Sequence, residues 1–277
     1  MFPVLFEFGG FTVTTFGLMI ALSFLAAGWV TARGLARAGH EPDHAWDLAV
    51  WAAVGGILGA KLYYMVLHFN ETALDPWTAL TSRSGLVWYG GFIGGSLAVL
   101  FRLHRLRLPV WPFGDAIAPG LAIGYVLGRI GCFLVGDDYG GPSSAPWAVR
   151  FPQGAPPSTA GNLRAFGVDV PAGTPDSAVL AVHPTQLYEA GIMLAIFFVL
   201  LRVRPRLAQA PGRLFFLWLA LAGAERFFVE FFRAKDDRFL GMFSVAQLIS
   251  LLLIATAAAL AWGMGRGTAR TPAAARA

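Results

Sequence analysis

The chain alternates between long apolar stretches and short polar segments rich in arginine. Seven of the apolar stretches have about the 20 residues that a helix needs to cross a bilayer. They lie near residues 13–32, 48–67, 85–101, 115–135, 185–201, 214–231 and 242–264. The pattern therefore predicts an all-α integral membrane protein with seven transmembrane helices.

The composition agrees with this pattern. Of the 277 residues, 56% are hydrophobic and 13% are charged, which is roughly half the charge of a soluble domain. These values exclude a secreted disulfide scaffold, a coiled coil and a disordered chain. The uncharged run at residues 8–32 is too long for a cleaved signal peptide. We expect one polytopic membrane domain over residues 1–265 and a short basic cytoplasmic tail at 266–277.

The distribution of positive charge predicts the orientation. With the N-terminus outside, 12 lysines and arginines fall in cytoplasmic segments and 7 in outer segments, while Lys61 and Arg129 fall inside spans. Cytoplasmic loops of membrane proteins are enriched in these residues. We therefore expect the N-terminus out and the C-terminus in. The net charge of +5 then reflects topology, and we expect no nucleic-acid partner.

The longest connection, residues 136–184, separates the fourth and fifth predicted spans. It holds eight of the seventeen prolines, and this composition disfavours a long helix. We expect an irregular periplasmic loop or a small cap, with room for a short strand near residues 147–151.

Glycines four residues apart recur in three predicted spans. Small residues at this spacing allow helix backbones to approach closely, so these pairs predict helix packing. The pairs are Gly55 and Gly59, Gly90 and Gly94, Gly91 and Gly95, and Gly124 and Gly128.

Several ionisable residues fall near the outer ends of the predicted spans. Arg129 lies between two uncharged runs, and a charge at mid-helix costs at least about 2.5–3.5 kcal/mol. Arg226, Glu230 and Arg233 share one helix face, and Glu189 opens the fifth span. Arginines at this level suit an anionic ligand, because guanidinium groups bind phosphate oxygens bidentately. The alternatives are that Arg129 snorkels to the outer headgroups or pairs with a carboxylate, and that the charges of the sixth helix form an ion-pair ladder within that helix.

The chain has one cysteine, Cys132. It cannot form an internal disulfide and offers no Cys/His spacing for a metal. Because free cysteine is usually a small apolar filler, we predict that Cys132 packs within the fourth helix, and we predict no metal site.

Several segments resemble, in order, the signature regions of the prolipoprotein diacylglyceryl transferase family. They include Trp88-Tyr89-Gly90-Gly91, Gly128-Arg129-Ile130-Gly131 and His183-Pro184-Thr185-Gln186. The full set covers residues 84–94, 128–133, 136–140, 146–152, 183–189, 226–233 and 244–250. The resemblance therefore extends over nearly the whole chain.

The resemblance implies a reaction and a location. The diacylglyceryl group of phosphatidylglycerol would pass to the lipobox cysteine thiol of a preprolipoprotein, forming a thioether and releasing glycerol phosphate, with no cofactor. The protein would lie in the bacterial inner membrane with its active face towards the periplasm. One alternative is a non-catalytic or repurposed member that binds phosphatidylglycerol or lipoprotein signal peptides. A small transporter or channel is a second.

The resemblance also implies site residues. Tyr89, Arg129 and Arg226 are the candidate catalytic residues, with the two arginines holding the phosphate. Glu230 and Arg233 would orient Arg226. The candidate substrate-binding residues are Gly90, Gly91, Cys132, Asp137, Gly140, Glu189, Glu230 and Arg233.

The chain departs from the family pattern at five positions. Tyr89 stands where the family usually has histidine, Cys132 where it has asparagine, and Asp137 where it has glutamate. Phe16 replaces a tyrosine and Gly141 an arginine. A phenol with an ordinary pKa near 10 is a poorer base than histidine, so we expect Tyr89 to act as a neutral donor or relay.

Overall fold

The computed structural model describes residues 4–9, 11–82, 85–234, 238–239 and 243–268, and it is mostly helical (69%). The start of the first resembling segment at Ser84 and the tail beyond residue 268 lie outside these residues. Two compact units make up the chain. The larger unit contains Met1–Ala27 and Ile117–Ala277, and the smaller unit contains Gly28–Ala116. A single domain over residues 1–265 stays a prediction.

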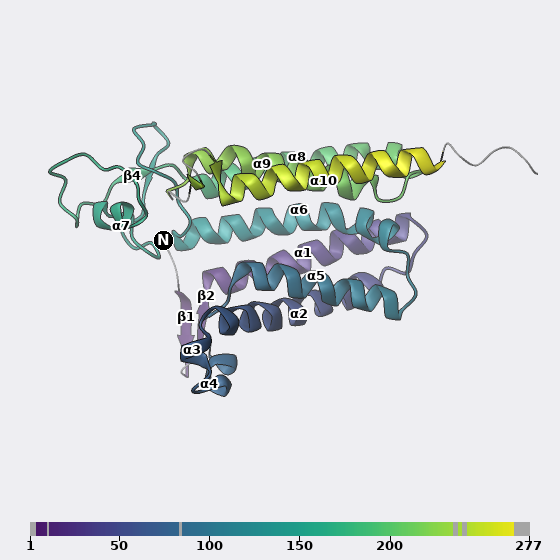
Figure 1. Cartoon of the computed structure of the whole chain (residues 1–277), viewed down its shortest axis with the longest axis horizontal. Coiled ribbons are helices and arrows are strands. Elements are labelled where there is room, and N and C mark those ends of the chain that lie inside the picture. Colours follow the sequence, from purple (N-terminus) through teal and green to yellow (C-terminus); the bar gives the residue numbers. More distant parts are fainter. Residues whose placement is uncertain (1–3, 10, 83–84, 235–237, 240–242, 269–277) are drawn as a thin grey trace, which may run out of the picture. The chain divides into compact units, whose positions relative to one another are not determined.

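The smaller unit is built on two helices that lie side by side, α2 (His44–Leu67) and α5 (Trp88–Arg105) (Figure 1). The short helices α3 (Phe69–Thr72) and α4 (Pro76–Thr81) connect them. Lys61 of α2 is buried and its Nζ donates to the backbone oxygen of Ser82 at 2.6 Å. A basic residue in a predicted span thus binds the C-terminal end of α4.

Glycines set the distance between α2 and α5. A Cβ added to Gly59 would lie against the backbone oxygen of Gly90 and 2.8 Å from the Cα of Gly94. A Cβ added to Gly55 would lie 2.8 Å from the oxygen of Gly94. Because no other residue leaves this space empty, the predicted pairs Gly55/Gly59 and Gly90/Gly94 pack these helices. The prediction does not hold for Gly128 in the fourth predicted span, where an added Cβ would meet nothing within 4 Å among the described residues.

The larger unit contains the first part of α1 (Thr15–Arg37), most of α6 (Val110–Val135), and three further helices. These are α8 (Thr185–Leu207), α9 (Arg213–Val229) and α10 (Val245–Thr268), and α9 lies beside both α8 and α10 (Figure 1). The core between α6, α8 and α9 is apolar and includes Ala122, Val126, Met193, Leu200 and Leu214.

Short strands and turns complete the larger unit. An N-terminal hairpin pairs β1 (Val4–Phe8) with β2 (Phe11–Thr14) in antiparallel register. The 3-10 turn η1 (Glu230–Phe232) follows α9 directly, and β5 (Arg238–Phe239) pairs with β6 (Phe243–Ser244) before α10.

The connection between α6 and α8 is irregular, as the proline and glycine content predicts. It contains only one short helix, α7 (Ala160–Ala165), and the antiparallel pair β3 (Val149–Arg150) and β4 (Ala181–Val182). The segment has an apolar core of its own around Tyr139, Phe151 and Leu163. It therefore folds as a small substructure attached to the helix ends.

Among the described residues, five helices are long and apolar enough to cross a membrane, which indicates a multi-pass membrane protein. They are α1, α2, α6, α8 and the Val245–Gly263 part of α10. The remaining two predicted spans are also helical, but α5 ends in Arg102 and Arg105 and α9 has 17 residues. Seven spans and their orientation stay predictions.

The contact between α2 and α5 can be tested with a matched pair of variants. Gly59→Ala should lower the free energy of unfolding by about 1–3 kcal/mol, because the added methyl group overlaps the backbone of α5. Gly56→Ala is the control, since its Cβ would lie 3.5 Å from the oxygen of Gly91 in ordinary contact. Thermal unfolding in detergent measures both. Equal stability of the two variants would mean that the helices are not in contact at Gly59.

Candidate functional site

Three helix ends converge in the larger unit. Helix α6 ends at Val135, α8 begins at Thr185 and α9 ends at Val229, and ion pairs join side chains from all three. We refer to these side chains as the charged cluster. It consists of Arg129, Asp138, Glu189, Arg226, Glu230 and Arg233.

Glu189 lies at the centre of the charged cluster. Its side chain is 1% exposed, and its Oε2 pairs with Nε of Arg129. Its Oε1 accepts from Nη1 of Arg226 at 3.2 Å and lies 3.8 Å from Nη1 of Arg233. Its place near the N-terminus of α8 also favours a negative charge. One buried carboxylate thus contacts three guanidinium groups.

Two further carboxylates complete the charge balance. Asp138 binds Nη1 of Arg129 at 2.9 Å through Oδ2 and Nη2 of Arg233 at 2.8 Å through Oδ1. Glu230 binds Nη2 of Arg226 at 2.6 Å and lies 3.8 Å from Nε of Arg233. Three positive and three negative groups therefore face one another, which offsets the cost of removing each charge from water.

The electrostatics keep Asp138 ionised. Burial alone would raise the pKa of its carboxyl, but the guanidinium groups of Arg233 and Arg129 hold that pKa well below its ordinary value. A carboxylate that stays charged over the physiological range can keep both arginines paired.

The backbone at Asp138 has a constrained conformation. Its φ of 57° lies in the left-handed region that non-glycine residues rarely adopt. The hydroxyl of Thr185 donates to its carbonyl oxygen at 2.9 Å. This conformation places the carboxylate between Arg129 and Arg233.

Gly140 fixes the turn that follows Asp138. Its N–H donates to the oxygen of His183 at 2.8 Å, and a Cβ here would lie 2.8 Å from both the Cβ of His183 and the Cγ2 of Thr185. Glycine at this position is thus explained by close packing of the backbone against the start of α8.

Cys132 and Asp137 lie beside the charged cluster without joining it through an ion pair among the described residues. Cys132 is partly buried on α6, three residues after Arg129. Asp137 has a buried Oδ1 that accepts no hydrogen bond from the described residues, and burial raises its pKa. The acid that binds the arginines is its neighbour Asp138, which sequence reasoning missed. The sequence places two consecutive acids one residue after the helix that carries Arg129, and this could have indicated an acid partner for the arginine.

The arginine of α6 has a second neighbour that sequence reasoning missed. The guanidinium carbon of Arg129 lies 5.1 Å from the ring centre of Tyr125, one helical turn earlier. A cation over an aromatic face is favourable, so Tyr125 supports Arg129 from within the helix. The i, i+4 spacing of Tyr125 and Arg129 could have predicted this contact.

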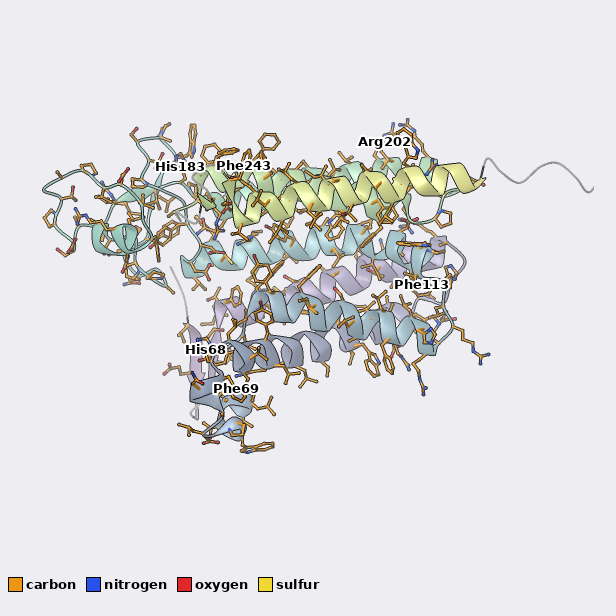
Figure 2. The ribbon with its side chains drawn as sticks, viewed as in Figure 1. His68, Phe69, Phe113, His183, Arg202 and Phe243 are labelled. Carbon is orange, nitrogen blue, oxygen red and sulfur yellow. The ribbon has the colours of Figure 1, made fainter. Side chains whose placement is uncertain are left out.

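A set of aromatic side chains borders the charged cluster at the start of α8. The hydroxyl of Tyr188 lies 3.1 Å from Nδ1 of His183 and accepts from Nε1 of Trp147 at 2.7 Å. The rings of His183 and Tyr188 pack against Phe232, and Figure 2 marks His183 just before α8. Burial lowers the pKa of His183, which favours the neutral imidazole.

Three candidate residues belong to the smaller unit. Tyr89 is exposed in the first turn of α5, and its ring packs edge-on against Trp88. Gly90 lies against Gly59 of α2, and a Cβ on Gly91 would be in ordinary contact with α2. Helix packing therefore accounts for Gly90 as a glycine.

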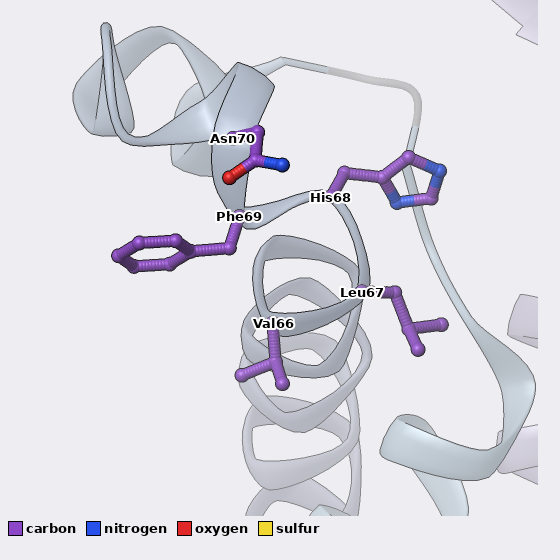
Figure 3. A pocket seen from close by; sticks show the side chains of 5 residues that line it. All are labelled: Val66, Leu67, His68, Phe69 and Asn70. Carbon is purple, nitrogen blue, oxygen red and sulfur yellow. The ribbon is translucent and has the colours of Figure 1, made fainter.

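The smaller unit also has a shallow hollow of about 200 Å³ at the junction of α2 and α3 (Figure 3). One short segment, Val66 to Asn70, lines it. The ring of His68 stacks on Tyr64 and its Nδ1 contacts the oxygen of the same residue. The hollow contains none of the candidate residues.

Comparison with known proteins adds a family. The family model described as prolipoprotein diacylglyceryl transferase matches residues 3–263. A curated relative from Clostridium tetani, named phosphatidylglycerol--prolipoprotein diacylglyceryl transferase, is 33% identical over 92% of this chain and 94% of the relative. Relatives of the same name from Nostoc sp. and Trichormus variabilis are 32% and 31% identical, each over 94% of this chain. They are covered over 88% and 89% of their lengths.

The central position of Glu189 makes a stability prediction. Glu189→Gln leaves three arginines with one carboxylate fewer, and loss of one partner of a buried ion pair costs on the order of 3–5 kcal/mol. Denaturant unfolding in detergent measures the loss.

Asp176→Asn is the matched control for Glu189→Gln. Asp176 is 79% exposed and pairs with Arg164 in the connection between α6 and α8, so its replacement should change stability by less than about 1 kcal/mol. A Glu189→Gln variant as stable as this control would contradict the central role of Glu189.

The lowered pKa of His183 predicts a pH dependence of stability. Below the unfolded value near pH 6.5, the unfolded chain binds a proton that the folded chain does not, so stability falls as the pH is lowered towards the folded pKa. His183→Gln should reduce this slope between pH 7.5 and 5. Unfolding temperatures across this range test it, and an unchanged slope in His183→Gln would count against the account.

Proposed function

The chain belongs to the prolipoprotein diacylglyceryl transferase family, and from this we propose the reaction that it catalyses. The diacylglyceryl group of phosphatidylglycerol passes to the thiol of a lipobox cysteine in a preprolipoprotein. The bond between the diacylglyceryl carbon and the phosphate oxygen breaks, a carbon–sulfur bond forms, and the thiol loses its proton. Glycerol phosphate leaves. The observation that carries this proposal is the convergence of three arginines on Glu189.

Arg129 and Arg226 are proposed to hold the lipid phosphate. Negative charge develops on the phosphate oxygen as the carbon–oxygen bond breaks, and positioned cations stabilise that charge. Glu189 supports this role because its two oxygens bind the two arginines separately. It fixes the guanidinium groups side by side, while 27% of the Arg226 side chain remains exposed. Glu230 and Arg233 position Arg226 and Asp138.

The acceptor thiol is proposed to be that of the substrate. The enzyme then needs no nucleophile of its own, and Cys132 is a packing residue beside the lipid. Tyr89 orients the thiol or the phosphate as a neutral donor or relay, because a thiol with a reference pKa near 8.5 is already partly ionised at neutral pH. Asp137 and Gly140, which lie beside the charged cluster, are proposed substrate-binding residues. Gly90 and Gly91 of the smaller unit are proposed substrate-binding residues as well.

The proposed setting is the bacterial inner membrane. Seven spans with the N-terminus out and the C-terminus in place the connection at residues 136–184 on the periplasmic side, where phosphatidylglycerol and the signal peptide of a preprolipoprotein meet the charged cluster. A non-catalytic role is less favoured, because the curated relatives are named as the enzyme and match this chain over most of their length.

Replacing either proposed phosphate ligand with lysine should impair the reaction. Lysine keeps the charge but loses the planar fork that binds two oxygens. Arg129→Lys and Arg226→Lys should each reduce transfer at least about tenfold, equivalent to roughly 1.4 kcal/mol. Transfer of isotope-labelled lipid to a lipobox peptide measures this.

Arg164→Lys is the control for these two variants, since Arg164 pairs with the exposed Asp176. It should transfer lipid at the normal rate. If Arg129→Lys and Arg226→Lys insert correctly and also turn over normally, the two arginines serve only as structural ion pairs.

The proposed role of Tyr89 gives a prediction about pH. Tyr89→Phe should lower the rate without a large change in the pH optimum, whereas Tyr89→His should retain or raise activity and add a transition near the ordinary histidine pKa of about 6.5. Rate profiles with the same peptide assay distinguish the variants. If Tyr89→Phe is fully active across pH 6 to 9, Tyr89 is a packing residue.

A further inference from the structure

Asp138 differs from the other members of the charged cluster in its exposure. Its side chain is 43% exposed, whereas the other five are mostly shielded from solvent. It nevertheless binds Arg129 and Arg233 through one oxygen each. The solvent-facing acid of the cluster therefore occupies guanidinium groups that a ligand entering from solvent would meet.

The geometry of this contact resembles that of a bound phosphate. Two guanidinium groups that grip two oxygens of one anion form the arrangement that arginine makes with carboxylate and phosphate alike. While Asp138 holds this position, Nη1 of Arg129 and Nη2 of Arg233 are engaged by the chain itself. An incoming phosphate gains these donors only if the carboxylate moves away.

The charge balance points in the same direction. With Asp138 in place, the ion pairs of the cluster join three arginines to three carboxylates. When the Asp138 carboxylate turns towards solvent, one positive charge is left uncompensated. The phosphate of a phosphodiester lipid carries one negative charge and restores the balance.

The local backbone allows such a movement without refolding. The carbonyl of Asp138 is held by the hydroxyl of Thr185, and the following Gly140 is bound to His183. These contacts fix the main chain, so the carboxylate can turn about its side-chain bonds once its ion pairs with Arg129 and Arg233 break. Its exposure gives it water to bind once it has left the arginines.

We propose that Asp138 is a placeholder anion, a positioning residue whose carboxylate, in the empty enzyme, occupies donors of Arg129 and Arg233. The lipid phosphate takes over these donors when it binds between Arg129 and Arg226. The Asp138 carboxylate is displaced when the phosphodiester binds, and it returns to help expel glycerol phosphate. This inference rests on the proposed function, because it assumes that the charged cluster receives the phosphate of the lipid.

Asp138→Asn tests the placeholder because it keeps the shape and removes the charge. With the competing anion gone, the KM for phosphatidylglycerol should fall about three- to fivefold, which is the range expected for a partly exposed ion pair. Inhibition by free glycerol phosphate should strengthen by a similar factor, while kcat should not rise. Asp176→Asn, the exposed control, should change none of these values.

A purely structural role of Asp138 predicts opposite changes in KM and in the inhibition by glycerol phosphate. If the carboxylate only holds the arginines in place, Asp138→Asn raises the KM for phosphatidylglycerol and weakens inhibition by glycerol phosphate. That result, or an unchanged KM and inhibition constant, would overturn the proposal.

A direct binding measurement keeps the proposal testable apart from turnover. Asp138→Gly suits the left-handed backbone and also lacks the carboxylate, so both variants should bind glycerol phosphate more tightly than the native protein in titration calorimetry. Tighter binding by a protein without transferase activity would support the placeholder while refuting the proposed reaction. Weaker binding by an active protein would refute the placeholder alone.

Discussion

The contact between Glu189 and three arginines is the interaction on which the rest of this site depends. A single guanidinium group near the end of an apolar helix is costly, and here three such groups share one buried carboxylate. The carboxylate is tolerated because it is paired, and the arginines are held close together because they share it. The convergence of α6, α8 and α9 and the clustering of the three arginines therefore have the same cause, which is their shared contact with Glu189.

The surrounding structure serves this contact in two ways. Apolar packing between α6, α8 and α9 brings the helix ends together, and the irregular connection after α6 supplies Asp138 and the turn at Gly140 that binds the start of α8. The smaller unit uses a different device, since glycines bring α2 and α5 into backbone contact. Fixed helix ends suit the proposed role of holding a charged headgroup, because each lost contact would leave an unpaired charge in an apolar setting.

Sequence reasoning recovered the long helices and part of the site, and the reason differs between residues. Hydrophobic runs located the helices, and helical periodicity placed Arg226, Glu230 and Arg233 near one another, where ion pairs join them. The prediction of one shared helix face was wrong for Arg233, because α9 ends at Val229 and Arg233 follows the 3-10 turn with an extended backbone. The bond from Arg226 to Glu189 joins residues 37 positions apart and depends on how α8 packs against α9, so no local pattern contains it. Asp138 was missed for a local reason: the turn after Gly136, whose φ is 76°, decides which of two adjacent acids faces the arginines.

The central claim is that the charged cluster receives the phosphate of the lipid while Glu189 continues to hold Arg129 and Arg226. An experimental structure of the protein in lipid nanodiscs with phosphatidylglycerol bound tests this most directly. The account predicts density for the phosphate within hydrogen-bonding distance of both guanidinium groups, with the Glu189 ion pairs intact. A headgroup bound elsewhere, with these arginines still paired only to carboxylates, would contradict it.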